Sequence, residues 1–316
     1  MAITSTIGRG GDAAARSVRH QLTAGQADIK GAVFKLLLLA SLGVSLAVLA
    51  ALFLDVGTTG ATVFANRAES FLSGGLRTKA EAAGVFQAIR GTFWIGVFVV
   101  VLAFPIGVAS AVYLEEYSTK GRLARLIDLN IRNLAGVPSI VYGILGLTIF
   151  VQQLSAITGG RSVMAAGLTL AVLVLPIVII TSAEAIKAVP APLREAGYGV
   201  GANRWEVTRT LVLPYALPGI ITGTVLALAR AIGEAAPLLL CGAVTGLLPS
   251  KDGLLDPSQL QDRFTALPIV IADWARTPRA GFDEIAAAAI IVMLVIVLAM
   301  NTVAIALRTR YEKKRT

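Results

Sequence analysis

Residues 163–183 read VMAAGLTLAVLVLPIVIITSA and contain no charged side chain. A helix that crosses a hydrocarbon core of ~30 Å needs roughly 20 predominantly apolar residues, and this run is long enough. The rest of the chain has the same character, because 56% of its residues are hydrophobic, only 15% are charged and the mean hydropathy is +0.76. A soluble globular protein has to keep a polar surface and is far less apolar. The sequence therefore predicts an all-α integral membrane protein.

Six apolar stretches meet or approach the length of a transmembrane helix. They are residues 36–54, 93–114, 134–151, 163–183, 217–243 and 285–307. The first is long for the apolar part of a signal peptide, so we expect it to be retained as a span. Prolines interrupt several stretches, either as ordinary kinks or as breaks along a transport path. These prolines are Pro105, Pro138, Pro176, Pro218 and Pro237.

The distribution of basic residues predicts the orientation, because cytoplasmic flanks of bacterial-type membrane proteins retain Lys and Arg. With six spans, both termini and residues 187–215 share one side of the membrane, and the segments on that side are the more basic ones. We therefore expect a multi-pass protein of the cell membrane with both termini in the cytoplasm. The net charge of +9 then reflects topology and attraction to anionic lipid, and we expect no nucleic-acid partner.

The same pattern divides the chain into four parts. Residues 1–35 form a cytoplasmic N-terminal tail, 36–84 the first transmembrane helix and an outer loop, 85–308 the remaining spans, and 309–316 a basic cytoplasmic tail. The single cysteine, Cys241, excludes an intrachain disulfide, and the single histidine, His20, leaves no ligand cluster for zinc or iron. We expect no metal site in this chain.

Residues 194–214, REAGYGVGANRWEVTRTLVLP, form a charged segment with glycines between the fourth and fifth apolar stretches. Pro190 can start a helix and Gly201 can turn the chain, so we expect a helix on each side of Gly201. The second helix has an apolar stripe. That stripe is Trp205, Val207 and Leu211. A rigid two-helix knob that docks a soluble partner is one interpretation, and an amphipathic segment on the membrane surface is the other.

Arg230 and Glu234 are charged residues within the fifth apolar stretch, and their spacing places them on one helix face. A charge near the bilayer centre costs at least ~2.5 kcal/mol on insertion scales, so each needs a partner or water. They could form a self-neutralising pair that holds helices together. Alternatively, they could form a gate, in which Glu234 holds the Arg230 guanidinium until a tetrahedral oxyanion competes for it.

Two weaker patterns lie near these segments. Gly219 and Gly223 make a G-x-x-x-G spacing, which predicts close contact with another helix. Glu184 lies near the cytoplasmic end of the fourth stretch, where we expect an interfacial residue beside Lys187.

The spacing within residues 195–214 resembles the EAA loop of ABC importer permeases. That pattern is E-A-A, three residues, G, nine residues, I, one residue, L-P. The matching residues here are Glu195, Ala196, Gly197, Gly201, Leu211, Leu213 and Pro214, with Gly197 and Leu211 in place of alanine and isoleucine. The resemblance implies that these residues form a helix-turn-helix that seats in a groove of a cytoplasmic ATPase and couples it to the membrane helices.

The chain itself cannot contain the phosphate-cradling loop G-x-x-x-x-G-K-[ST], because no lysine follows a glycine. We therefore expect a transport subunit and not an enzyme. ATP and magnesium would belong to the partner ATPase, with no cofactor on this chain.

Most of residues 85–308 resembles the PstA-type permease subunit of phosphate importers. The resemblance is carried by residues 111–117 (AVYLEEY), 133–143 (NLAGVPSIVYG), 228–238 (LARAIGEAAPL) and 264–269 (FTALPI). It implies a type I ABC importer permease bundle, MetI-like, with six transmembrane helices. It also implies a second permease subunit as heterodimer partner, an ATPase dimer, an extracytoplasmic phosphate-binding protein and inorganic phosphate as the substrate.

Three alternatives share parts of this pattern. A permease for another oxyanion, such as sulfate or molybdate, would keep the EAA loop, and an arginine binds sulfate as readily as phosphate. An ion-driven secondary transporter would need no ATPase. A membrane component that mainly signals external phosphate would differ in function rather than in sequence pattern. In an importer, we expect the long outer segment 244–281 to dock the binding protein.

Overall fold

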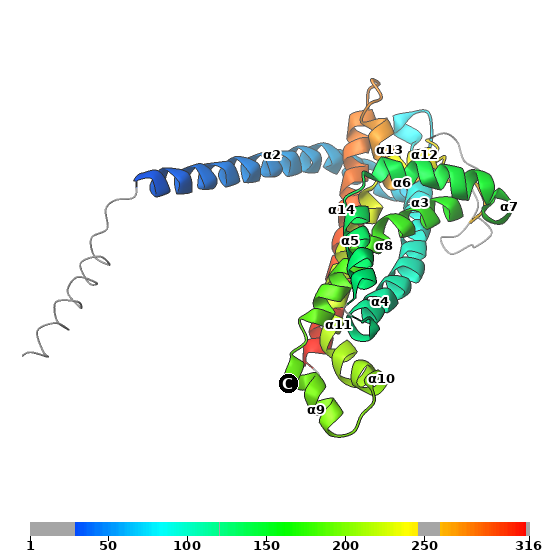
Figure 1. The fold of residues 1–316 in the computed structure, drawn as a ribbon. Coiled ribbons are helices and arrows are strands. Elements are labelled where there is room, and N and C mark those ends of the chain that lie inside the picture. Colours follow the sequence, from blue (N-terminus) through cyan, green and yellow to red (C-terminus); the bar gives the residue numbers. More distant parts are fainter. Residues whose placement is uncertain (1–28, 120, 246–259, 314–316) are drawn as a thin grey trace, which may run out of the picture. The chain divides into compact units, whose positions relative to one another are not determined.

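The computed structural model describes residues 29–119, 121–245 and 260–313 (Figure 1). Residues 1–28, which include His20 and most of the expected N-terminal tail, lie outside this described part, as do residues 246–259 of the expected outer segment. The chain divides into two compact units, Met1–Asp55 and Val56–Thr316. Every regular element of the described residues is helical.

The described part of the first unit belongs to α2 (Ile29–Ser73), which ends in the second unit. The predicted first span, 36–54, lies within this helix, and its leucines, valines and phenylalanines are exposed. The remaining helices belong to the second unit. They are α3 (Phe86–Phe98), α4 (Phe104–Val112), α5 (Arg122–Ala135), α6 (Ser139–Gly146), α7 (Ser155–Thr158), α8 (Val163–Lys187), α9 (Ala191–Gly199), α10 (Arg204–Val207), α11 (Leu213–Gly233), α12 (Ala236–Leu240), α13 (Leu267–Trp274) and α14 (Phe282–Lys313).

Shorter helical segments join several of these helices. A 3-10 turn, η1 (Ala80–Ala82), precedes α3. The other segments are π-helical, and they are η2 (Val99–Ala103), η3 (Tyr113–Tyr117), η4 (Leu147–Gln153) and η5 (Thr208–Val212). Two of them precede the helical turns that contain Pro105 and Pro214. Because proline has no N–H group, the regular hydrogen-bond ladder cannot continue through it, and a local π-turn accommodates the change.

The described residues contain five helices that are long and apolar enough to cross a membrane. They are Ile29–Ser73, Phe86–Tyr117, Val163–Lys187, Arg204–Gly233 and Phe282–Arg310. The pair Arg122–Ala135 and Ser139–Gln153 is a sixth candidate, bent by 96°. This confirms the prediction of an all-α membrane bundle.

The third predicted span, 134–151, is wrong as a single straight helix. α5 ends at Ala135, and α6 begins at Ser139 after the bend. Pro138 lies at this break, where its ring disfavours helical conformation in the preceding residue. The first arm, α5, is amphipathic and carries charged residues, so a search for uninterrupted apolar runs does not find it.

The fifth predicted span, 217–243, is wrong at its C-terminal end. The continuous helix begins at Arg204 and ends at Gly233, and Glu234 has the extended backbone angles φ −79° and ψ 114°. The short helix α12 follows, with Pro237 in its first turn. Glycine destabilises a helix interior, and proline cannot donate the backbone hydrogen bond that continues a helix. Gly233 and Pro237 therefore explain why the helix breaks within this apolar run.

α8 is central to the second unit, where it packs against α3, α4, α5, α6 and α11. The predicted glycine contact is confirmed on α11. An added Cβ on Gly219 would lie 2.8 Å from the Cβ of Ala185, and one on Gly223 would overlap Thr181. Both neighbours belong to α8, so the small residues allow the two helices to approach closely.

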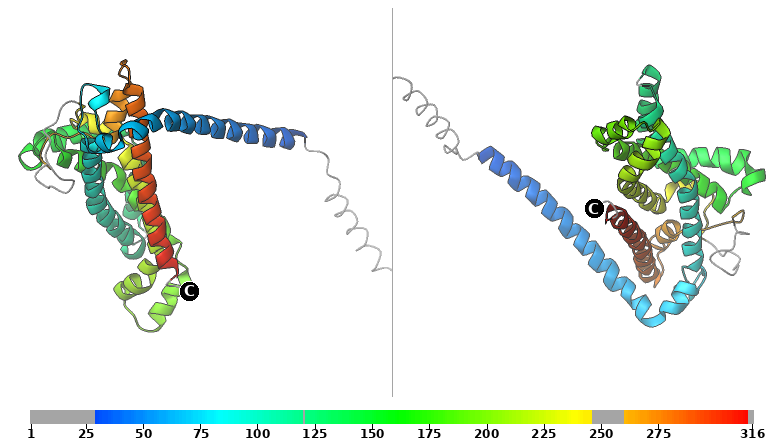
Figure 2. Two further views of the ribbon diagram at one scale, coloured as in Figure 1. Left: turned by 180° about the vertical axis from the view of Figure 1, so that it is seen from behind. Right: turned by 90° about the horizontal axis from the view of Figure 1, so that it is seen from below.

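Figures 1 and 2 show α9 and α10 at one end of the second unit, together with the C-terminal end of α14, and α12 and α13 at the opposite end. At the opposite end, Phe71, Val85, Leu267 and Trp274 share a buried cluster with α14. α2 has a non-helical residue at Arg67 (φ −155°, ψ 39°). The Arg67 guanidinium donates to the carbonyl oxygens of Ala80 and Ala83 at 2.6 and 2.9 Å, so the kinked end of α2 is fixed to the segment before α3.

Candidate functional site

The charged segment forms the predicted two-helix knob, which comprises α9, the turn 200–203 and α10. Gly201 has φ +84°, a left-handed conformation that glycine adopts without strain. Asn203 and Glu206 then make a capping box: the Asn203 Oδ1 accepts from the Glu206 N–H at 3.0 Å, and the Glu206 carboxylate accepts from the Asn203 N–H at 2.8 Å. The sequence itself therefore encodes the turn and the start of the second helix.

The knob presents a mixed surface to its surroundings. Glu195 and Ala196 are exposed on α9, and Pro214 is exposed in the first turn of α11. Near the turn, Val200 is 85% exposed and Tyr198 is 44% exposed. Exposed apolar side chains beside a carboxylate, on a helix pair with a fixed turn, are typical of a protein-docking surface.

The inner face of the knob is closely packed. Gly197 is buried in α9, where an added Cβ would lie 2.7 Å from the Cδ1 of Leu211 and 2.9 Å from a methyl group of Val207. Val207 is fully buried and Leu211 packs against the same cluster. Trp205, the third member of the predicted stripe, is 55% exposed and does not share this buried face with Val207. The packing of the knob against the buried cluster around Val207 favours the two-helix knob over the alternative of an amphipathic segment on the membrane surface.

Three consecutive residues at the end of η3 meet three basic residues of the knob and its approach. Glu115 pairs with Lys187 at 3.0 Å, and Glu116 pairs with Arg194 at 2.9 Å. The third contact places the Arg204 guanidinium over the Tyr117 ring, 5.4 Å from its centroid. Lys187, beside which Glu184 was expected as an interfacial residue, forms its ion pair with Glu115 of the second span.

Arg194 makes more of these contacts than either of the other basic residues. Its Nε and Nη2 both donate to Glu116 Oε1, at 3.2 and 2.9 Å. The same guanidinium donates to the carbonyl oxygens of Ile186 and Val189, at 2.9 and 2.6 Å. The Ile186 carbonyl lies in the last turn of α8, and the Val189 carbonyl lies two residues beyond the end of this helix. Arg194 thus caps α8 and binds the end of the second span at once.

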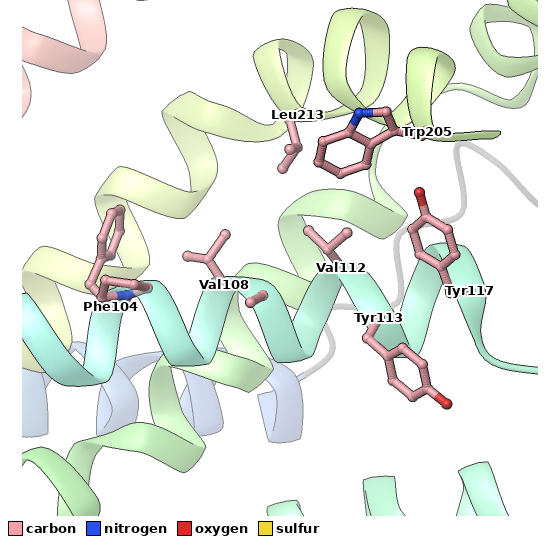
Figure 3. A pocket seen from close by; sticks show the side chains of 9 residues that line it. Phe104, Val108, Val112, Tyr113, Tyr117, Trp205 and Leu213 are labelled. Atoms are coloured by element: carbon pink, nitrogen blue, oxygen red, sulfur yellow. The ribbon is translucent and has the colours of Figure 1, made fainter. Parts of the chain in front are cut away.

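An apolar pocket of about 490 Å³ lies beside these contacts. Figure 3 shows Trp205 and Leu213 pointing from the α10–α11 helix toward the helix that carries Val108 and Val112, with Tyr117 facing Trp205. The other lining residues are Phe104, Pro105, Ala109 and Tyr113. Leu213 of the EAA-like pattern therefore faces the second span and not the exposed surface of the knob.

Arg230 and Glu234 lie at the other end of α11. Their ion pair joins Arg230 Nε to Glu234 Oε1 at 3.4 Å, and the side chains are 52% and 18% exposed. The break after Gly233 places Arg230 in the last turn of its helix, where a cation interacts favourably with the C-terminal carbonyls. The pair therefore marks the junction between α11 and α12 rather than the middle of a continuous span.

The candidate residues thus fall into two separate groups. Glu195, Ala196, Gly197, Gly201 and Leu211 lie in the knob or against it, and Leu213 and Pro214 begin α11. Arg230 and Glu234 lie far along α11 from them. Glu116 and its contact with Arg194 were missed, because the two residues are 78 positions apart. The only signal in the sequence was a pair of glutamates at the end of an apolar run.

Known proteins resemble this chain in sequence and in fold. Residues 103–316 match the family model described as the binding-protein-dependent transport system inner membrane component. The phosphate transport system permease protein PstA 1 of Mycobacterium tuberculosis (strain CDC 1551 / Oshkosh) is 33% identical over 235 residues, which are 74% of this chain and 73% of that protein. PstA of Yersinia pestis is 33% identical over 232 residues, 73% and 74% of the two chains.

Two solved structures share the fold. One is a chain of a bacterial alginate ABC transporter in complex with an alginate pentasaccharide-bound periplasmic protein. It matches with a TM-score of 0.61 and 15% identity, and the match covers 89% of this chain and 95% of that chain. The other is a chain of the methionine ABC transporter MetNI in an inward-facing conformation. It matches with a TM-score of 0.52 and 18% identity, and the match covers 72% of this chain and 94% of that chain. These structures confirm the type I ABC importer permease fold. The matched family model spans both groups of candidate residues, and the chain belongs to the family of binding-protein-dependent transport system inner membrane components.

Proposed function

We propose that the chain is one permease subunit of an ABC importer that carries inorganic phosphate across the cytoplasmic membrane. A separate ATPase dimer hydrolyses ATP, and this chain converts its motion into opening and closing of the membrane helices. The observation that carries the proposal is the knob, in which Glu195, Ala196 and Val200 are exposed on a rigid helix pair.

The knob supports ATPase coupling for two physical reasons. Its turn and second helix are fixed by Gly201 and by the capping box, so a force applied at the tip is not lost in a flexible loop. Its inner face is packed against the start of α11, so displacement of α9 and α10 reaches a transmembrane helix directly. The orientation that follows has the knob and both termini in the cytoplasm.

Phosphate is the proposed substrate because the matched relatives from M. tuberculosis and Y. pestis are named phosphate transport permeases. Arg230 is the candidate for transient contact with the anion. Its side chain is 52% exposed, and its Nε lies 3.4 Å from the Glu234 carboxylate, a distance at the outer limit of a hydrogen bond. A tetrahedral oxyanion with two accepting oxygens competes well for such a guanidinium.

The proposed partners are a second phosphate permease as heterodimer partner, the ATPase dimer and an extracytoplasmic phosphate-binding protein. Of the expected docking segment 244–281, α13 is buried, with Leu267, Val270 and Trp274 almost fully covered. The described parts of that segment that are exposed and can receive the binding protein are residues 261–263 and the loop 275–281, which carries Arg276 and Arg279.

The test is reconstitution of the chain with its candidate partners in proteoliposomes. Glu195→Arg should abolish ATP-driven phosphate uptake and weaken co-purification of the ATPase, because it reverses a charge on the docking surface. Glu81→Arg is the matched control, since Glu81 is also exposed but lies in η1, away from the knob. Normal uptake by the Glu195→Arg complex, or equal loss in both variants, would contradict the proposed docking surface.

A further inference from the structure

We propose that the η3 clamp is where motion of the knob enters the second membrane helix, Phe86–Tyr117. The η3 clamp comprises the contacts Glu115–Lys187, Glu116–Arg194 and Tyr117–Arg204. The inference rests on the proposed function, since it concerns how an ATP-driven importer passes force between its parts. It assigns Glu116 and Arg194 as positioning residues for transport.

The order of the contacts supports this role. The three residues of η3 are consecutive, whereas their partners lie at the end of α8, in α9 and at the start of α10. The end of one membrane helix is therefore held by every part of the segment that leads into and through the knob. A displacement of either knob helix acts on the same short stretch of the second span.

Burial identifies the central contact of the clamp. The Glu116 side chain is 6% exposed and that of Arg194 is 22% exposed, whereas Lys187 is 50% exposed. An exposed ion pair is screened by water and contributes little to stability. A buried carboxylate that loses its partner is left as an uncompensated charge, which is strongly destabilising. Loss of the Glu116–Arg194 contact should therefore have a larger effect than loss of the exposed Glu115–Lys187 pair.

Arg194 also joins more than two elements. It accepts no hydrogen bonds and donates to Glu116, to Ile186 and to Val189, so η3, the end of α8 and α9 meet at one planar group. A guanidinium fixed by several directional bonds cannot slide as an apolar contact can. Movement of α9 must therefore carry the end of η3 with it or break these bonds.

The neighbouring pocket increases the share of the η3 clamp in the connection between the second span and the α10–α11 helix. Apolar side chains of α4 and of the α10–α11 helix line a space of about 490 Å³ between them, beside Tyr117 and Trp205. Close packing transmits displacement, and a space of this size interrupts it along this face. Within the η3 clamp, the contact of Arg204 with the Tyr117 ring joins the two helices that line this space.

The experiment compares Glu116→Gln with wild type in the complete complex of both permeases, ATPase and binding protein in proteoliposomes. Phosphate uptake and ATP hydrolysis are measured on the same vesicles. The glutamine keeps the shape of the side chain but removes its charge. We expect the ATPase to stay bound and active while the phosphate carried per ATP falls by about tenfold, within the usual range of coupling between sites. Asp128→Asn is the matched control, because Asp128 forms an exposed ion pair within α5 alone.

An unchanged ratio of phosphate to ATP in an assembled Glu116→Gln complex would overturn the proposal, as would an equal fall for Asp128→Asn. If Glu116→Gln prevents assembly, Tyr117 provides the test. Tyr117→Leu removes the aromatic ring under Arg204 and should lower the ratio, whereas Tyr117→Phe keeps the ring and should not. Equal ratios for these two variants would also overturn the proposal.

The wild-type complex separates this inference from the proposed function. Absence of ATP-driven oxyanion uptake in wild type contradicts the proposed function. Uptake of sulfate instead of phosphate contradicts the substrate, and the same ratio is then measured with sulfate. Normal wild-type uptake with unaffected variants contradicts the η3 clamp alone.

Discussion

Gly197 and Leu211 fit together across the inner face of the knob, with space for a hydrogen atom and not for a methyl group between them. A Cβ at residue 197 would lie 2.7 Å from Leu211 Cδ1 and 2.9 Å from Val207 Cγ2. Leu211 can move the end of its side chain, but Val207 is β-branched and fully buried. The spacing of α9 against the following helix is therefore set by the absence of a side chain at residue 197.

Gly197→Ala should destabilise the knob by about 1–3 kcal/mol, the usual cost of overpacking a well-filled site. The cost should be smaller in a Leu211→Ile background, because the branch at Cβ withdraws the methyl group that faces residue 197. Thermal denaturation of the four proteins of this double-mutant cycle in detergent measures the coupling. Strictly additive effects would show that the two positions do not share one space.

Gly223→Ala should disrupt the contact between α11 and α8, because the added methyl group would overlap Thr181. We expect a clear fall in melting temperature and in the yield of monodisperse protein. Gly57→Ala is the control, since an added Cβ on Gly57 meets nothing within 4 Å. Equal stability of the two variants would contradict the close approach of α8 and α11 at this position.

Arg67→Ala should loosen the connection between α2 and the segment before α3. Each hydrogen bond from a charged donor contributes about 1.5–3 kcal/mol, and Arg67 gives two, to Ala80 and Ala83. A lower melting temperature should follow, while Lys79→Ala, an exposed change in the same segment, should leave it nearly unchanged. Protease sensitivity between α2 and α3 provides a second measurement, and an unaltered cleavage pattern would count against this connection.

Arg230→Ala should lower phosphate uptake by about tenfold or more, since a hydrogen bond to a charged group is worth about 1.5–3 kcal/mol. Arg132→Ala is the matched control, because Arg132 forms an ion pair of the same spacing with Asp128 on α5. Both variants should reach the membrane in wild-type amounts. Uptake by Arg230→Ala at normal affinity and rate would remove Arg230 from the substrate path and leave its contact with Glu234 as a structural pair.

The sequence predicted the parts of the fold that depend on local composition. Four of the apolar stretches lie within long helices, because length without charge is sufficient to identify a span. The stretches that failed contain backbone breaks, at Pro138 and at Glu234, which hydropathy does not register. The domain boundaries expected from the sequence stay predictions.

The knob could be predicted because its turn and cap are encoded by neighbouring residues, namely Gly201, Asn203 and Glu206. The contact between Glu116 and Arg194 could not, since no local pattern relates residues so far apart in the chain. The resemblance to the EAA loop also left Gly197 and Leu211 as two separate departures. Their contact shows that the smaller residue at one position leaves room for the longer side chain at the other.

The role of this chain in phosphate import is tested most directly by ATP-dependent uptake of labelled phosphate into proteoliposomes. The vesicles contain this chain with the second permease, the ATPase and the binding protein, and they are challenged with excess unlabelled sulfate. We predict that uptake resists sulfate, is inhibited by unlabelled phosphate and requires ATP inside the vesicles on the ATPase side. Failure of an assembled, ATP-hydrolysing complex to take up phosphate, or displacement of the label by sulfate, would contradict the assignment of phosphate as the substrate.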